Sequence, residues 1–279
     1  MKKILLLIAV TGLLLGTISC GDDDDIRPVR TQFTVNTTMF NHMTSGNNVI
    51  GLVMTKNKLE IDTLKHIASL ELNYNDGQGD KMLKLDGLTA MPKGLMFYEL
   101  ASSNYPSFKG YVDFNEGGAM RYSYTTAEGI RVISMTPEVF YRKTASTVTY
   151  DDTTKTTNWE NAMYQFNISP TTKTATIQVL DILHAKDLKR FESITAVNVP
   201  FTVTANGFSI NATNLPTDAY YIAYVDSTGT SHSRTNKYPF KTFNATIDLA
   251  NDKLDADFMI GGSATVKATG KTYSNYTVE

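Results

Sequence analysis

The side chains best suited to catalysis or metal binding are few in this sequence, and they are scattered. No two of the four histidines have the i, i+2 or i, i+4 spacing of metal ligands: His42, His66, His184 and His232. Glu60, Asp62 and His66 are close in sequence, as are His184 and Asp187, but surface and loop positions are the commoner setting for such residues. No G-x-S-x-G serine hydrolase signature occurs. We therefore expect no catalytic residue, no metal and no cofactor, and we expect that the protein is not an enzyme.

Three short motifs suggest ligand chemistry and fail on spacing. Asp255 and Asp257 share one face of a strand, where paired carboxylates could hydrolyse a glycoside, but alternation of acidic and apolar residues is typical of an exposed sheet face. Residues 73–80, NYNDGQGD, offer oxygen ligands without the spacing of a calcium loop, and favour an Asp-Gly hairpin. Residues 269–272, TGKT, lack the earlier glycine of a phosphate loop, because Thr265 stands there.

Aromatic residues are the remaining candidates for ligand binding. Exposed aromatic rings stack on sugar rings and other flat ligands, whereas buried rings belong to the core. The core is the commoner role. The weak candidates for a ligand site are Trp159, Tyr220, Tyr221 and Tyr224.

The elements that must position these residues are β-strands. Residues 201–213, FTVTANGFSINAT, alternate apolar and polar side chains on both sides of Asn206-Gly207, a pair that tolerates the positive φ angles of a tight hairpin turn. Residues 243–268 form three further alternating segments, with turns at 251–252 and 261–262. The apolar face of these three segments comprises Phe243, Ala245, Ile247 and Leu249, then Leu254, Ala256, Phe258 and Ile260, then Ala264, Val266 and Ala268.

The pattern predicts a mainly antiparallel β fold, built as barrel or sandwich units and arranged as a possible tandem pair. Residues 61–70 and 181–191 have some helical spacing, so each is either a short helix or a strand with a connecting turn. A loose similarity between residues 105–114 and 238–249 suggests an internal repeat, with chance similarity as the alternative. We predict one β domain over residues 32–140 and a second over 141–279, and the Thr-rich residues 143–157 form either a linker or an exposed hairpin.

The N-terminus carries an export signal. Three residues with two lysines precede the apolar residues 4–15, as in a secretory signal peptide, and the run is shorter than the roughly 20 residues of a membrane span. The only cysteine, Cys20, follows the small or modest residues 16–19. This segment resembles the lipobox of bacterial lipoproteins, although Thr17 stands where leucine is usual. The resemblance implies that residues 1–19 are removed and that Cys20 is lipidated; the alternative is an ordinary secreted protein with a free thiol.

An acidic block follows the cysteine: Asp22, Asp23, Asp24 and Asp25. It resembles the signal that follows the lipidated cysteine in surface-exposed lipoproteins of the Bacteroidetes, and it is also typical of a solvated spacer. Residues 20–31 are thus expected to form a lipidated acidic tether. Without Lys2, Lys3 and the four aspartates, the 26 basic and 28 acidic residues become 24 of each, so the body is neutral and nucleic acid binding is not expected.

The lipobox, the acidic block and the run from residue 206 through Tyr238-Pro239 to Gly270 resemble Bacteroidetes lipoproteins of unknown function with calycin-like β-barrel domains. The resemblance implies a closed barrel in residues 141–279 whose mouth can hold a ligand. It also implies anchoring in the outer membrane through the lipid, facing outward or, alternatively, facing the periplasm. The expected function is non-catalytic binding of a small ligand, a glycan or an envelope protein. The alternative is a structural or assembly subunit of an envelope or adhesion complex.

Overall fold

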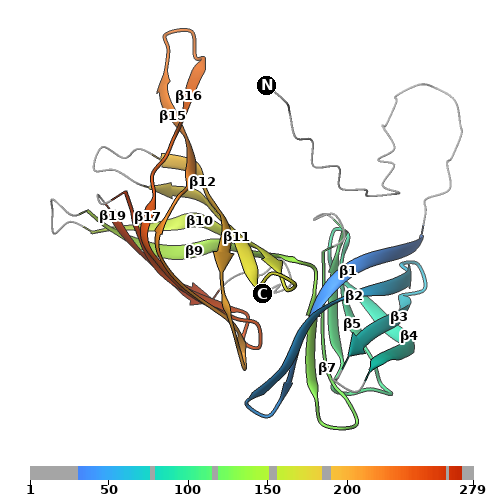
Figure 1. Ribbon diagram of the computed structural model, residues 1–279. Coiled ribbons are helices and arrows are strands. Elements are labelled where there is room, and N and C mark those ends of the chain that lie inside the picture. Colours follow the sequence, from blue (N-terminus) through green and yellow to red (C-terminus); the bar gives the residue numbers. More distant parts are fainter. Residues whose placement is uncertain are drawn as a thin grey trace, which may run out of the picture.

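The computed structural model describes residues 31–75, 79–114, 119–150, 156–183, 190–261 and 264–271, and most of them lie in strands (Figure 1). All strand pairs are antiparallel, which confirms the predicted mainly β fold. These ranges contain no α-helix, so no helical segment in them could cross a bilayer. Residues 61–70 are the end of one strand, a turn and the start of the next, while of the second candidate helix 181–183 is strand and 184–189 lies outside the described residues.

The first half of the chain forms a closed barrel of eight strands, each paired with the next along the chain and the last paired with the first. The strands are β1 (Gln32–Ser45), β2 (Asn48–Asp62), β3 (Ile67–Asn75), β4 (Asp80–Gly94), β5 (Phe97–Ala101), β6 (Lys109–Asp113), β7 (Ala119–Thr125) and β8 (Arg131–Met135). This closed barrel lies within residues 32–140, the predicted first β domain, and the barrel expected in residues 141–279 stays a prediction.

The second half forms one 11-stranded sheet in the order β13-β14-β17-β18-β19-β9-β10-β11-β12-β15-β16. Its strands are β9 (Glu138–Tyr150), β10 (Thr156–Ser169), β11 (Thr174–Leu183), β12 (Arg190–Pro200), β13 (Thr202–Thr204), β14 (Gly207–Leu215), β15 (Asp218–Val225), β16 (Ser231–Asn236), β17 (Phe240–Asp248), β18 (Lys253–Ile260) and β19 (Ala264–Lys271). Of the Thr-rich residues 143–157, residues 143–150 belong to β9 and 156–157 to β10, which pair with each other, while 151–155 lie outside the described residues.

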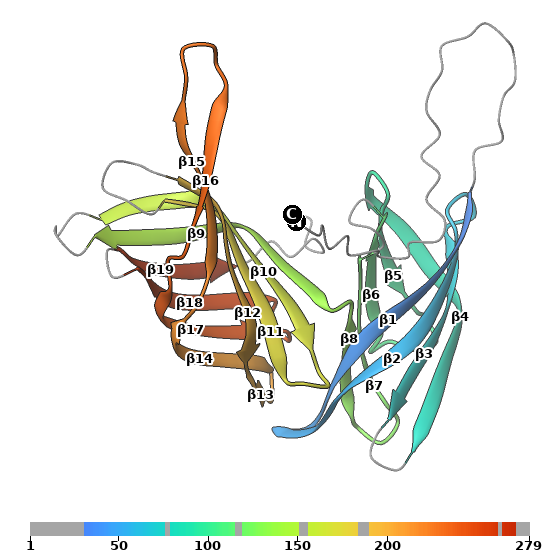
Figure 2. The same cartoon turned by 45° about the horizontal axis from the view of Figure 1, so that its top comes forward.

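This second sheet curls back on itself. Pro200 ends the pairing of β12 with β11, and only Phe201 separates β12 from β13, which pairs with β14 at the opposite end of the order. Residues 190–204 thus pair with β11 through β12 and with β14 through β13, and these are the two ends of the run from β14 to β11. The hairpin β15–β16 is inserted between β14 and β17, which pair directly, and it projects beyond the rest of the sheet (Figures 1 and 2).

The two halves have closely similar strand connections. If β12 and β13 count as one strand and the projecting hairpin is set aside, the second sheet is an eight-stranded meander whose last strand, β19, pairs with its first, β9. Tyr105-Pro106 precedes β6 and Tyr238-Pro239 precedes β17, each the sixth strand of its unit. The two sheets divide at residues 136–137, and the domain boundary at 140 stays a prediction.

Strand β1 contributes to both hydrophobic cores. Its central residues are buried on both faces, because one face lines the barrel and the other packs on the second sheet. Met39 and Met43 belong to the core of the barrel, while Phe40 belongs to the core of the second sheet and contacts Phe208 edge to face. Ile133 and Met135 of β8 join the second core in the same way.

Two arginines of the barrel hold two turns of the second sheet. Arg131 donates from Nη2 to the carbonyl of Ala205 (2.8 Å) and to Oδ1 of Asn206 (3.2 Å). Arg121 forms an ion pair with Asp252 (2.8 Å) and donates to the carbonyl of Leu249. The two sheets are therefore joined by apolar contact and by hydrogen bonds at fixed points.

Candidate functional site: a polar opening in the barrel wall

The barrel wall opens between β2 and β3. Strand β2 pairs with β1 along its whole length but with β3 only over residues 58–62, opposite 67–71. Beyond this point β3 continues to Asn75 paired only with β4. Main-chain groups at the opening must therefore find partners other than a neighbouring strand.

Three asparagine side chains supply those partners. The Oδ1 atom of Asn57 accepts a hydrogen bond from the backbone N–H of Asn73 (2.9 Å). The side-chain amide of Asn73 donates to the carbonyl of Lys56, and Nδ2 of Asn41 donates to the carbonyl of Asn73 (2.7 Å). The N–H and carbonyl of Asn73 and the carbonyl of Lys56 are thus bonded although the strand ladder has ended.

Behind the opening, Ser134 of β8 links two of these asparagines across the barrel interior. Its hydroxyl donates to Oδ1 of Asn41 (2.6 Å) and accepts from Nδ2 of Asn57 (3.3 Å). Asn41, Asn57 and Ser134 are at most 3% exposed. Unpaired buried polar atoms are costly, so a network in which these atoms are all bonded holds its members in one arrangement.

An open groove of about 460 Å³ lies over this network. It is lined only by polar and charged residues: Asn36, Thr37, Thr38, Lys56, Asn57, Lys58, Glu71 and Asn73. Within the described part of the chain, the exposed side chains of Asn36, Thr38 and Lys56 make no hydrogen bond or ion pair. The groove therefore presents amide, hydroxyl and ammonium groups that are available to a ligand.

The other charges in the lining are Lys58, which is ion-paired, and Glu71, which forms no ion pair or hydrogen bond within the described part of the chain. Lys58 forms an ion pair with Glu60 (2.7 Å), and this hydrogen bond raises the pKa of Lys58 and lowers the pKa of Glu60. Lys56 is left as the unpaired cation of the lining. Such a set can bind a hydroxyl-rich or anionic molecule by hydrogen bonds, and it lacks the adjacent nucleophile and base of covalent catalysis.

The acidic residues near the start of β3 have a structural role. Asp62 accepts hydrogen bonds from the backbone N–H groups of Leu64 (3.1 Å) and Lys65 (2.9 Å) and from the side chain of Gln32 (3.1 Å). These bonds fix the turn that contains His66, whose φ angle is 57°. A second open groove of about 460 Å³ includes Asp62 in its lining but not His66. In the ranges described, no group of three or more acidic, histidine or cysteine residues could hold a metal ion.

Asp255 and Asp257 lie on the outer face of β18, as their alternation predicts, while Leu254 and Ala256 are buried. They line a shallow depression of about 220 Å³ over β14, β17 and β18. Asp255 is ion-paired with Lys253 (2.7 Å). This face has no buried polar group aimed into it among its described lining residues, so it is a weaker candidate than the opening between β2 and β3.

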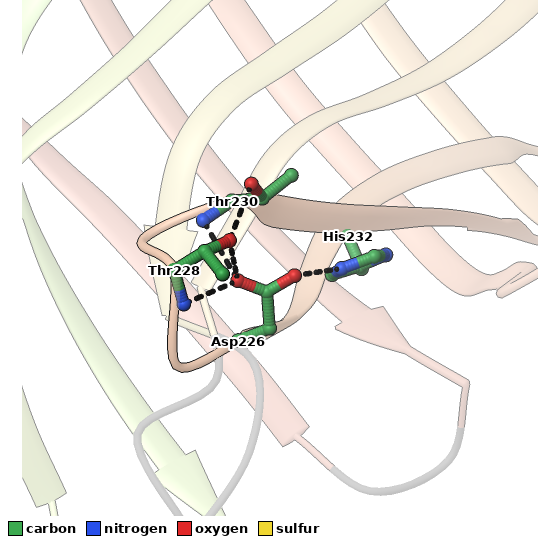
Figure 3. Close-up of polar contacts among 4 residues, drawn as sticks. All are labelled: Asp226, Thr228, Thr230 and His232. Carbon is green, nitrogen blue, oxygen red and sulfur yellow. Dashed lines mark hydrogen bonds and ion pairs between the residues drawn. The ribbon is translucent and has the colours of Figure 1, made fainter.

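The tip of the projecting hairpin carries an aspartate–histidine pair (Figure 3). Asp226 accepts hydrogen bonds on Oδ1 from the hydroxyl of Thr228 (2.6 Å) and the N–H of Thr230 (3.0 Å), and on Oδ2 from Nε2 of His232 (2.8 Å). These bonds hold the pKa of Asp226 well below its usual range. The threonine hydroxyl bonds to the carboxylate and not to the imidazole, so the cluster fixes the turn and is not a catalytic triad.

The aromatic candidates are placed on separated strands. Trp159 of β10 donates from Nε1 to the carbonyl of Asp181 on β11 (2.5 Å) and packs against the second core. Tyr220 and Tyr221 lie on β15, which is separated from β10 by β11 and β12. The strand spacing puts them roughly 14 Å from β10. Tyr220 is 38% exposed, and the side chains of Tyr221 and Tyr224 lie outside the described part of the structure, as do Cys20 and residues 22–25.

Comparison with known proteins gives little further guidance. No family model matches the chain, and no curated protein matches it. Among solved structures, the chain is similar to the crystal structure of a "putative outer membrane protein" from Bacteroides fragilis NCTC 9343, at 12% sequence identity and a TM-score of 0.34. The match covers 85% of this chain and 97% of that one. At this TM-score the similarity assigns neither a fold nor a function.

Proposed function

We propose that the protein is a cell-envelope lipoprotein that acts as a non-catalytic binding module. The leader, Cys20 and the acidic tether support anchoring in the outer membrane through an N-terminal lipid, with the body facing outward or, alternatively, the periplasm. The eight-stranded meander of β1–β8 supports a calycin-like barrel.

The observation that carries the binding role is the polar groove at the opening between β2 and β3. Asn57 in its lining is fixed by the hydrogen bonds to Ser134 and Asn73, and its rim offers the unpaired side chains of Asn36, Thr38 and Lys56. Groups that are already fixed lose little freedom on binding. Amides, a hydroxyl and one ammonium match a hydroxyl-rich ligand, so we propose that the ligand is a glycan or a similar polar small molecule.

A glycan array of neutral and acidic oligosaccharides tests this role, and calorimetry then measures the Kd of each hit. We expect at least one oligosaccharide to bind, and its Kd to rise at least tenfold in the double variant Asn36→Ala/Lys56→Gln. Thr246→Val, on the outer face of β17, is the matched control and should leave the Kd unchanged. Absence of any binding, or equal loss in the control, would contradict the proposal.

Lipid anchoring is tested separately. Cys20→Ala should release the protein from the membrane fraction into soluble form, because the cysteine is the attachment point that the lipobox implies. Fractionation followed by immunoblotting measures this, with Thr17→Leu as a control that should stay membrane-bound. A Cys20→Ala protein that remains in the membrane fraction would refute lipid anchoring at this residue.

A further inference from the structure

The part of β2 that extends past β3 has one edge without a partner strand. Residues 48–57 pair with β1 on one side, and no other described strand pairs with them. The carbonyl of Lys56 points away from β1, because it accepts its hydrogen bond from the side chain of Asn73 on β3. Main-chain groups alternate between the two edges of a strand, so those of Met54 and Leu52 point the same way as those of Lys56.

Apart from a register irregularity between Val49 and Gly51, this edge has few of the features by which proteins usually protect free strands. Residues 48–55, Asn-Val-Ile-Gly-Leu-Val-Met-Thr, include no charged residue and no proline. Val49, Ile50 and Met54 are 37–39% exposed. A long, uncharged and apolar edge is a template for pairing with another chain, and it is normally shortened, charged or covered.

The two end strands of the 11-stranded sheet, β13 and β16, are protected against pairing with another chain. Strand β13 has only three residues, and β16, Ser-His-Ser-Arg-Thr-Asn, is polar throughout and includes His232 and Arg234. Residues 48–55 of β2 have neither the short length of β13 nor the charged side chains of β16.

The edge is also held in place. Leu52 packs against the core of the second sheet, and β1, the partner of β2, is buried on both faces beside it. Strand β2 therefore does not have to become ordered when a further strand pairs with it, which lowers the entropic cost of binding.

We propose that the edge of β2 between Asn48 and Lys56 receives an extended segment of a partner polypeptide, which pairs with it as an additional strand. The partner segment carries apolar side chains at alternate positions, to cover Ile50 and Met54. It also carries an acidic residue at the end beside Lys56, whose ammonium has no ion-pair partner in the described ranges. This interaction surface lies next to the polar groove and is separate from the glycan-binding role.

The test uses a dye-labelled octapeptide of alternating valine and threonine with glutamate in first position, which antiparallel pairing places beside Lys56. Fluorescence anisotropy with the full chain should show saturable binding. The same peptide with N-methyl groups on alternate amides, which cannot form the ladder, should not bind. If the chain binds neither peptide, or binds both equally, the proposal is wrong.

Two variants locate the binding to the edge. Met54→Pro removes the outward N–H and leaves the ladder with β1 intact, so the Kd for the peptide should rise at least tenfold. Met54→Thr keeps this N–H, so its Kd for the peptide should rise less. Circular dichroism checks that both variants fold, and oligosaccharide binding should persist in both. Unchanged peptide affinity in Met54→Pro would overturn the proposal. So would a dimer of the unmodified chain that Met54→Pro abolishes in sedimentation velocity, since the occupant would then be a second copy.

Discussion

Asn57 shows how a single side chain can replace part of a strand ladder. It bonds the backbone N–H of Asn73 through its oxygen and the Ser134 hydroxyl through its nitrogen, at the point where β2 and β3 part. The sequence contains a signal for this role, because a buried-face position in an alternating strand is occupied by a polar residue. That signal identifies a buried polar group but not its partners, which come from strands 16 and 77 residues away.

Asn57→Ala should lower the free energy of unfolding by about 1–3 kcal/mol, because it leaves the N–H of Asn73 without a partner and removes the hydrogen bond that the Ser134 hydroxyl accepts. Urea unfolding measures the change. Asn36→Ala, an exposed side chain on the same groove, is the control and should stay within about 0.5 kcal/mol of the parent. Equal effects of the two variants would show that the network contributes nothing specific.

His42 is the buried histidine at the contact between the two sheets. Its Nε2 donates to the carbonyl of Thr204 (2.7 Å), and its Nδ1 is buried without a hydrogen-bond partner in the described structure. Burial, together with the positive charge of Arg131, lowers the pKa of His42 below its ordinary value of 6.5. His42 is 0% exposed, and its sequence neighbourhood indicates no particular setting for it.

This lowered pKa makes stability depend on pH. Between the pKa of His42 in the folded chain and 6.5, the unfolded chain binds more protons than the folded chain. The contribution of His42 to the free energy of unfolding is therefore fully present above pH 6.5 and is lost as the pH drops below it. His42→Gln, whose amide can still donate to Thr204, should reduce this loss. Urea unfolding of parent and variant at about pH 7.5 and about pH 5.5 tests this. If the free energy of unfolding falls by the same amount between the two pH values in both proteins, His42 is not the cause.

At the scale of elements, local sequence patterns located the C-terminal hairpins well. The turn at Asn206-Gly207 joins β13 to β14, and the alternating segments of residues 243–260 are β17 and β18, with their predicted apolar residues buried. Strand β3 ends at Asn75 and β4 begins at Asp80, and the two residues pair with each other, as the hairpin predicted for residues 73–80 requires. These features are encoded by neighbouring residues, so a single sequence reveals them.

The parting of β2 from β3 could not be predicted in this way. In β2 the apolar run of residues 49–54 gives way to alternation near the parting, but this change does not say which strand pairs there. The parting depends on β1 and β2 reaching the second sheet, where Leu52 and Phe40 pack. Long-range packing therefore creates the candidate site, and short-range sequence patterns do not contain it.

Gly207 offers a test of how tightly one of these turns is built. Its φ is 154°, and a Cβ atom there would lie 2.1 Å from the carbonyl oxygen of Ile247 on β17. Gly207→Ala should therefore lower the melting temperature by several degrees, in keeping with a loss of more than about 1 kcal/mol. Gly129→Ala is the control: its φ of 80° is also positive, but nothing lies within 4 Å of the added atom, so the decrease should be smaller. The opposite order would contradict the steric argument.

At the scale of the whole molecule, the barrel and the second sheet share one continuous core region and two arginine contacts. The chain should therefore unfold in a single cooperative transition. Trp159, the only tryptophan, reports on the second sheet by fluorescence, and circular dichroism reports on both sheets. The two transitions should coincide in the parent chain.

Arg121→Ala combined with Arg131→Ala should separate these transitions, because the turns of the second sheet lose their hydrogen bonds to the barrel. Lys253→Ala, an exposed lysine on β18, is the control and should leave them coincident. Transitions that differ already in the parent chain would show that the two sheets unfold independently of this contact.

The hairpin β15–β16 leaves the second sheet after Leu215 and returns at Phe240, two residues that pair with each other. Within it, β15 pairs with β12 and Ala219 is buried in the second core, so it is the turn of residues 226–230 that can vary in length without shifting the register of another strand pair. This makes the position a natural site for evolutionary diversification. It also gives the protein engineer a place to graft a foreign loop, such as an epitope to be displayed, on a scaffold that keeps its core.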